Sequence, residues 1–204
     1  PDTGTSWTKT IGTSSLYVCT GNIGASDESD NCNAGTVSNS IGALYTADAT
    51  YDSADYTVQF TANALDTSDD VAIVALRIQD TNNMYAVRIN VDASGSQIYE
   101  KVAGTWSTIG SPFTLTTGKI EFIVSGSDLT VEDNDSVVRT VNDTSHSAAG
   151  KAGIGVGNVI LALDDTDNFE FDSFSVTTVA SGDTLSGTVY SDEGTTGLGS
   201  QTVR

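Results

Sequence analysis

Turn-forming residues cluster about every eight to twelve residues along this chain, and short runs with strand periodicity lie between the clusters. In 55–63, for example, Tyr56, Val58 and Phe60 alternate with polar residues. Alternation with a period of two is typical of a β-strand buried on one side, and many short strands joined by turns are typical of a sandwich. The pattern therefore predicts an all-β fold.

Residues 70–79 (DVAIVALRIQ) depart from this alternation, because they are apolar at successive positions. Such a run predicts a central strand that is covered on both faces. The next four residues, 80–83 (DTNN), have turn chemistry, and a further strand is expected over 84–91. The two strands and their turn therefore form a predicted hairpin.

The segment 169–179 contains a change of phase. Phe169 and Phe171 share one parity, whereas Phe174 and Val176 have the other. One extra residue returns such side chains to a single face. We therefore expect a β-bulge near positions 172–173.

The acidic composition restricts the partners of this 204-residue chain. It contains 27 Asp and Glu but only 8 Lys and Arg, which gives a net charge of −19. Nucleic acids and anionic membrane surfaces are bound through clustered cations, so neither is an expected partner. No run of 18 apolar residues is present, so no membrane-spanning helix is expected. The acids serve either solubility or the binding of divalent cations.

Several segments resemble the laminin-G-like and concanavalin A-like jelly rolls. Arg77, Asp80, Asn83 and Tyr85 reproduce an RxxDxxNxY pattern, and later pieces follow in the family's order over about residues 50–178. The resemblance implies a sandwich of two antiparallel sheets that belongs to an extracellular protein. It also implies glycan binding, sometimes with a structural Ca²⁺.

Catalysis is not expected. Hydrolases of this fold carry Glu-x-Asp-x-x-Glu, because glycoside hydrolysis needs paired carboxylates. Here Glu170 and Asp172 supply the first half, but Ser175 stands where the second Glu would fall. The one histidine, His146, lies in a polar stretch and is expected on the surface without a catalytic role. Gly153 and its neighbouring glycines are expected to serve close sheet packing and not nucleotide binding.

Four residues are candidates for glycan binding: Arg77, Arg88, Tyr99 and Trp106. The two arginines interrupt apolar strands, so they could point into a groove, and Trp106 is expected at a turn tip. Planar polar groups and aromatic faces are the side chains that recognise sugars. The alternative is that each arginine pairs with an aspartate and that Trp106 caps the sandwich edge.

An acidic loop is the candidate Ca²⁺ site. Its hard oxygen donors are Asp164, Asp165, Asp167, Asn168 and Asp172, and Ca²⁺ takes six to eight such oxygens. The alternative is a solvated turn, which is common for Asp and Asn. A weaker candidate of the same kind is 27–30.

Cys19 and Cys32 are the only cysteines. A disulfide between them would close a polar loop and would stabilise it by about 3 kcal/mol in the chain-entropy model. Zinc is not expected, because there is no second cysteine pair and no histidine cluster. A disulfide implies an oxidising compartment, so the protein is expected to be secreted or exposed on a cell surface.

The composition changes after Ser181. We expect a jelly-roll domain over 1–180 and, over 181–204, the start of a second β-module or an exchangeable strand arm centred on Leu185, Val189 and Tyr190. Two functions follow from these features. One is a non-catalytic recognition or adhesion module, with glycans as partners. The other is a structural subunit of a filament, sheath or virion that assembles with copies of itself by β-strand addition.

Overall fold

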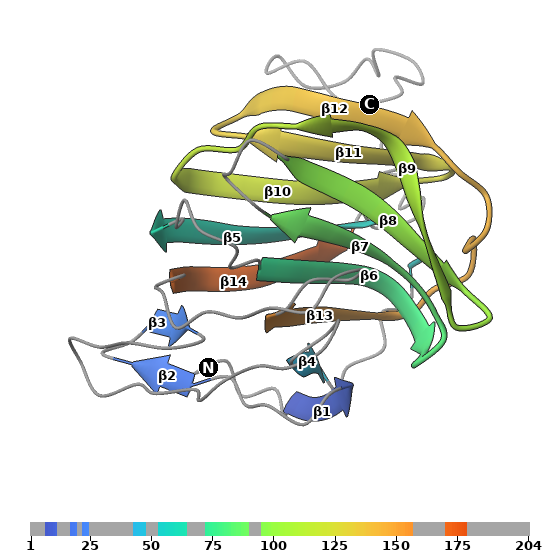
Figure 1. Ribbon diagram of the computed structural model, residues 1–204, viewed down its shortest axis with the longest axis horizontal. Helices are drawn as coiled ribbons and strands as arrows, with labels where there is room; N and C mark the ends of the chain where they lie inside the picture. Colours follow the sequence, from blue (N-terminus) through green and yellow to red (C-terminus); the bar gives the residue numbers. More distant parts are fainter. Residues whose placement is uncertain are drawn as a thin grey trace, which may run out of the picture.

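The computed structural model describes residues 7–11, 17–19, 22–24, 43–47, 53–64, 72–89, 95–156 and 170–178. These residues form two seven-stranded antiparallel sheets that face one another (Figure 1). Within them there is no helix with the length and apolarity needed to cross a membrane. The predicted all-β, two-sheet jelly-roll sandwich is therefore confirmed.

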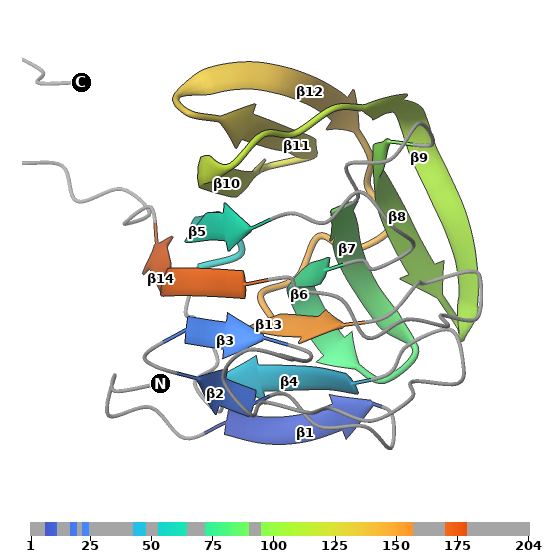
Figure 2. The same ribbon diagram turned by 60° about the vertical axis from the view of Figure 1, so that its left-hand side comes forward.

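Sheet A has the strand order β1 (Trp7–Ile11), β4 (Ala43–Ala47), β13 (Lys151–Val156), β6 (Ala72–Asp80), β7 (Asn83–Ile89), β8 (Ser96–Val102) and β9 (Thr105–Phe113). Sheet B has the order β12 (Ser136–Asn142), β11 (Asp128–Asp133), β10 (Gly118–Ser125), β5 (Tyr56–Ala64), β14 (Glu170–Thr178), β3 (Asn22–Gly24) and β2 (Tyr17–Cys19). Edge strands β9 and β12 meet at one end of the sandwich (Figure 2). There Arg139 Nη2 donates to the Pro112 carbonyl at 3.0 Å.

The main core lies between the sheets. Tyr56, Val58 and Phe60 of β5 are fully buried, and they belong to one cluster with Val74 and Leu76 of β6. Alternate residues of each strand enter this layer, as the period of two predicts. The face assigned to β5 from its sequence is therefore confirmed.

The outer face of sheet A, which points away from sheet B, is apolar at its centre. Ile73, Ala75 and Ile78 of β6 form a second buried cluster there with Met84 and Ala86 of β7. Because β6 is the middle strand of sheet A, it buries side chains on both faces, as the run 70–79 predicts. The turn at 80–83 is also confirmed.

A β-bulge interrupts β14 where the sequence predicts one. Asp172 pairs with Thr61 and Ser175 with Gln59, so three steps along β14 oppose two along β5. Ser173 has a φ of 55°, a backbone conformation that a bulge accommodates. After the bulge, Phe174 and Val176 pack against the main core.

Candidate functional site

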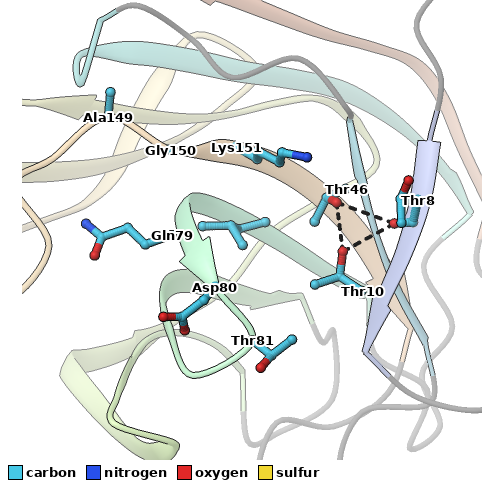
Figure 3. A pocket seen from close by; sticks show the side chains of 10 residues that line it. Thr8, Thr10, Thr46, Gln79, Asp80, Thr81, Ala149, Gly150 and Lys151 are labelled. Atoms are coloured by element: carbon cyan, nitrogen blue, oxygen red, sulfur yellow. Dashed lines mark hydrogen bonds between the residues drawn. The ribbon is translucent and has the colours of Figure 1, made fainter.

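The outer face of sheet A holds a pocket with a volume of about 460 Å³ (Figure 3). It lies where β1 and β4 approach the end of β6 and the start of β13. Ten residues line it: Thr8, Thr10, Thr46, Ile78, Gln79, Asp80, Thr81, Ala149, Gly150 and Lys151. Seven of these residues have polar side chains, while carbon atoms supply most of the exposed lining surface, so the pocket suits a ligand that has both hydroxyls and an apolar face.

A bulge in β6 shapes one wall of the pocket. Ala75 pairs with Gly153 and Ile78 with Lys151, so β6 has one residue more than β13 over this stretch. Arg77 has a φ of 45° at the extra position. Ile78 thereby returns to the outer-face cluster and reaches the pocket. Nothing in the alternation of the sequence predicts this bulge.

Gly150 and Gly153 allow β13 to lie close to its neighbours. A Cβ on Gly150 would come within 2.6 Å of the Arg77 carbonyl carbon, and one on Gly153 within 2.8 Å of the Tyr45 carbonyl oxygen. Both distances are shorter than side chains tolerate. The close-packing role expected of Gly153 is therefore confirmed.

Arg77 is directed away from the pocket and is only 1% exposed. Its guanidinium donates to the carbonyls of Ala54, His146 and Gly126 at 2.7–2.8 Å and pairs with the Asp55 carboxylate at 3.1 Å. A buried arginine with these partners holds the strand ends together. We therefore leave Arg77 out of the candidate ligand surface, since its donors are already used inside the protein.

Three threonines form the opposite wall. Thr10 Oγ1 and Thr46 Oγ1 are 2.7 Å apart, and each also lies 3.3–3.4 Å from the Thr8 carbonyl oxygen (Figure 3). Each hydroxyl has one hydrogen, so one hydroxyl donates to the other. The hydrogen of the accepting hydroxyl can then form only a long bond to the Thr8 carbonyl. Thr46 is only 2% exposed, so the arrangement open to a ligand is the one in which Thr46 donates to Thr10 and the Thr10 hydrogen is left for a ligand acceptor.

Asp80 supplies a carboxylate at the mouth of the pocket. Its Oδ1 accepts the Asn82 backbone N–H at 2.6 Å, and both of its oxygens accept from Asn83 Nδ2 at 2.9–3.0 Å. These bonds, from the Asn82 backbone first and the Asn83 side chain second, lower the pKa of Asp80. The carboxylate is therefore ionised at neutral pH, and Oδ2 keeps a lone pair for a ligand hydroxyl.

Lys151 lines the pocket from the start of β13 and is half-buried. Its side chain extends toward the threonine wall (Figure 3). Among the residues that the structure describes, its ammonium has no hydrogen-bond or ion-pair partner, whereas its backbone carbonyl accepts from the Tyr56 hydroxyl at 3.2 Å. The pocket thus presents an available cation on one side and a carboxylate on another.

An aromatic group adjoins the pocket through Thr81. Lys101 Nζ donates to the Thr81 carbonyl at 2.7 Å and lies 5.2 Å from the centre of the Trp106 ring. Trp106 packs edge-on against Tyr99 with the ring centres 6.4 Å apart, and the Arg88 guanidinium lies 5.9 Å from the Tyr99 ring. Partial burial lowers the pKa of Lys101 and raises that of Tyr99. The structure thus brings together three of the four predicted glycan-binding residues.

The exposure of these three residues differs. Tyr99 is 3% and Arg88 8% exposed, and Arg88 Nη2 donates to the Gly95 carbonyl at 2.9 Å. Trp106 is half-buried and lies near the start of β9, so its predicted place at a turn tip is wrong. The tip is formed by Ala103 and Gly104 instead. Trp106 is therefore the aromatic ring of this group that a ligand can reach.

His146 is buried, which corrects the surface position expected from its polar neighbours. It is 2% exposed, its Nε2 is 2.8 Å from the Lys101 carbonyl oxygen, and its backbone N–H donates to the Tyr85 hydroxyl at 3.0 Å. Tyr85 in turn donates to Asp143 at 2.6 Å. Burial raises the pKa of Tyr85. Burial alone would also raise that of Asp143, but hydrogen bonds from Tyr85 and Ser145 outweigh it and lower the pKa. This network anchors the segment before β13.

Other predicted sites lie partly or wholly outside the described residues. They are the side chains of the acidic loop 164–168 and of Asp172, the loop 27–30, the partner Cys32 of Cys19, and the arm 181–204 with Leu185, Val189 and Tyr190. Among the residues whose positions are described, no group of three or more His, Cys, Asp or Glu side chains could hold a metal ion. The calcium site, the disulfide and the assembly arm remain predictions.

No protein-family model and no curated protein sequence match this chain. Solved structures share its fold. The carbohydrate-binding module CBM66 from Bacillus subtilis aligns over 85% of this chain and 96% of its own, with a TM-score of 0.59 and 15% identity. The exoplasmic/lumenal domain of VIP36, in its Ca²⁺/Man-bound form, aligns over 88% and 85% (TM-score 0.54, 10% identity). A legume lectin-like domain from Entamoeba histolytica aligns over 85% and 90% (TM-score 0.51, 11% identity). The fold is thus a lectin-like sandwich.

Sequence reasoning missed the pocket itself. Its threonines come from β1 and β4, in the first 50 residues, where the family pattern is weakest, and no spacing links them to Lys151. One signal was available: cations are scarce in this chain, and Lys151 directly follows Gly150 in a glycine-rich segment. Asp80 was recognised as a turn residue and as part of the RxxDxxNxY pattern, but not as a ligand-binding residue.

Proposed function

We propose that this chain is a non-catalytic glycan-binding module and that it binds sugar in the pocket on the outer face of sheet A. The observation that carries the proposal is the polar pocket, where hydroxyls, a carboxylate and an ammonium converge. The shared fold supports it, because carbohydrate-binding modules and lectins have the same architecture. Fold alone does not define a ligand, so the argument depends on the pocket.

The geometry suits a sugar ring. Sugar hydroxyls both donate and accept, and the pocket offers acceptors at Asp80 and donors at Thr10 and Lys151. Ile78 gives the lining an apolar contact for ring carbons. Trp106 lies beyond Thr81, where a second sugar of a longer glycan would stack on its ring.

The pocket does not offer hydrolytic chemistry. Glycoside hydrolysis needs two carboxylates that flank the bond. Asp80 is the one carboxylate among the ten lining residues, and the hydrogen bonds that form the β6–β7 turn hold it ionised. A binding role without turnover is therefore the function that this site supports.

A glycan array with the purified chain tests the proposal. The informative variant is the double substitution Thr10→Val and Thr46→Val, which removes both members of one hydroxyl pair and so leaves no unsatisfied partner between them. We expect it to weaken binding of any sugar hit by about threefold to tenfold, the value of one neutral hydrogen bond.

The chain contains a matched control on the opposite sheet. Thr130 Oγ1 and Thr140 Oγ1 are 3.1 Å apart across β11 and β12, outside the pocket. The double variant Thr130→Val and Thr140→Val should bind as the unsubstituted protein does. Equal losses in both double variants, or an array without a single hit, would contradict a glycan site at this pocket.

We further propose that the module works outside the cell, with a Cys19–Cys32 disulfide and a Ca²⁺ ion on the 164–172 segment. The support is the cysteine pair and the cluster of acidic residues in the sequence. Mass spectrometry of unreduced peptides tests the disulfide, and a melting curve with and without a chelator tests the ion. Free thiols at Cys19 and Cys32 would contradict the disulfide. A melting temperature that the chelator does not change would contradict the Ca²⁺ site.

A further inference from the structure

Lys151 differs from the other cations whose contacts are described. Lys119 pairs with Glu121 at 3.0 Å and also with Asp135, and Arg77 pairs with Asp55. Lys101 donates to a carbonyl and contacts a tryptophan ring. Lys151 has no such partner within the described part of the chain, although acidic residues outnumber basic ones 27 to 8 in the sequence.

The lack of a partner is informative because the side chain is half-buried and lines a pocket. A fully solvated lysine has water as its partner, but a lysine with less access to water gains more from an anion. Asp80 lines the same pocket, yet the two groups form no ion pair. The pocket therefore holds its positive and negative groups apart, with space between them.

We propose that the pocket takes an acidic sugar, with the ligand carboxylate on Lys151 Nζ and ring hydroxyls on the Asp80 side. This inference rests on the proposed glycan-binding function and names the ligand class for the same site. A uronate fits the arrangement, because it carries one carboxylate on a ring whose other substituents are hydroxyls. Repulsion from Asp80 fixes the orientation, since the reversed pose would place two carboxylates together.

The threonine wall supports this orientation. When Thr46 donates to Thr10, the Thr10 hydroxyl keeps its own hydrogen and can donate it to the second carboxylate oxygen. Asp80 Oδ2 can accept from a ligand hydroxyl at the other side. Hydrogen bonds in which one partner is ionised are about twice as strong as neutral ones, so the Lys151 contact should dominate the preference.

The charge balance favours one anionic group per binding site. The net charge of −19 repels a densely charged polyanion, and the pocket contains a single ammonium. At physiological salt the screening length is about 8 Å, so the distant acids weaken binding of one carboxylate only slightly. A single uronate is therefore a better ligand than a heavily sulfated chain.

Calorimetric titration of the full chain tests the inference with defined probes. Methyl β-D-glucuronide and methyl α-D-galacturonide are compared with the corresponding neutral methyl glycosides, and sulfated monosaccharides form a third arm. We expect at least one uronide to bind about tenfold or more tightly than its neutral counterpart. Lys151→Met should abolish that preference, and Lys151→Arg should retain it.

Lys119→Met is the matched control, because Lys119 lies on sheet B and is already paired. It should leave the preference unchanged, and melting curves of all variants establish that each is folded. A preference that survives Lys151→Met, equal affinity for uronide and neutral sugar, or tighter binding of the sulfated probes would overturn the inference while leaving glycan binding in place. No binding of any sugar would overturn the proposed function as well.

Discussion

The outer faces of the two sheets use the same residue types in different ways. Each carries a hydrogen-bonded pair of threonines on adjacent strands, and a lysine lies on each face: Lys119 on sheet B and Lys151 in the pocket of sheet A. On sheet B the lysine is neutralised by two carboxylates. On sheet A, Lys151 forms no ion pair with any residue that the structure describes, and the threonines lie with it in a pocket.

The difference shows how a binding site differs from a solvated sheet surface of similar composition. On sheet B, Thr57, Ile123, Thr130 and Thr140 form one cross-strand row over four strands, and their exposure is partial or high. On sheet A, the β6 bulge and the glycines of β13 break such regular rows and leave a hollow. Local irregularity, and not composition, creates the candidate site.

The largest expected effect comes from the residue at the β6 bulge. Arg77→Met removes the donor for three carbonyls and for Asp55, so buried acceptors lose their partner. We expect the free energy of unfolding to fall by about 3 kcal/mol, at the lower end of the range for breaking a buried pair. Urea denaturation measures it.

The control for Arg77 is Arg139→Met, which loses one bond to the Pro112 carbonyl and a contact with the Phe113 ring. It should cost about 1 kcal/mol. If the two variants lost similar stability, the bulge would not depend on Arg77, and the comparison between the two faces would lose its structural basis.

Trp106→Ala sharpens the comparison on the ligand side. Because Trp106 adjoins the pocket through Lys101 and Thr81, its loss should weaken binding of an oligosaccharide by about threefold to tenfold, the range for an aromatic contact. Affinity for a single sugar should stay within about twofold. Val137→Ala, at a 61% exposed position of sheet B, is the control and should change neither affinity. Equal losses for short and long ligands would place Trp106 outside a second subsite.

The smallest expected effect concerns pH and the turn that carries Asp80. Because hydrogen bonds lower the folded-state pKa of Asp80, the turn's contribution to stability is full above the ordinary pKa of about 3.9 and is lost as the pH falls through the folded-state value. NMR titration of the carboxyl carbon measures this pKa. Asn83→Ala removes both bonds from Asn83 Nδ2 and should raise the pKa of Asp80. An unchanged pKa in that variant would mean that Asn83 does not stabilise the carboxylate.

Alternation along the strands predicted the architecture, because burial of one face is recorded in every second residue. The same logic predicted the β14 bulge, since Phe174 and Val176 must return to the core. The bulge at Arg77 could not be predicted in this way. Because β6 buries apolar side chains on both faces, Ile78 would fit either face, and its change of phase leaves no mark in the sequence.

The candidate site was predicted only in part. Arg88, Tyr99 and Trp106 meet because β7, β8 and β9 are consecutive hairpins, so their proximity follows from local pairing. The pocket joins β1, β4, β6 and β13, which lie up to about 140 residues apart in the sequence. Contacts at such separations leave no local pattern. The burial of His146 was missed for the same reason, because its partners are Lys101 and Tyr85.

The most direct test of the central claim is an NMR titration of the isotopically labelled chain with its best glycan hit. Binding at the outer face of sheet A predicts the largest amide shifts at Thr8, Thr46, Thr81 and Lys151, with a shift of the Trp106 indole for longer ligands. Amides of the sheet B row, such as Ile123 and Thr130, should not move. Shifts concentrated on that row, with the pocket unaffected, would contradict the account.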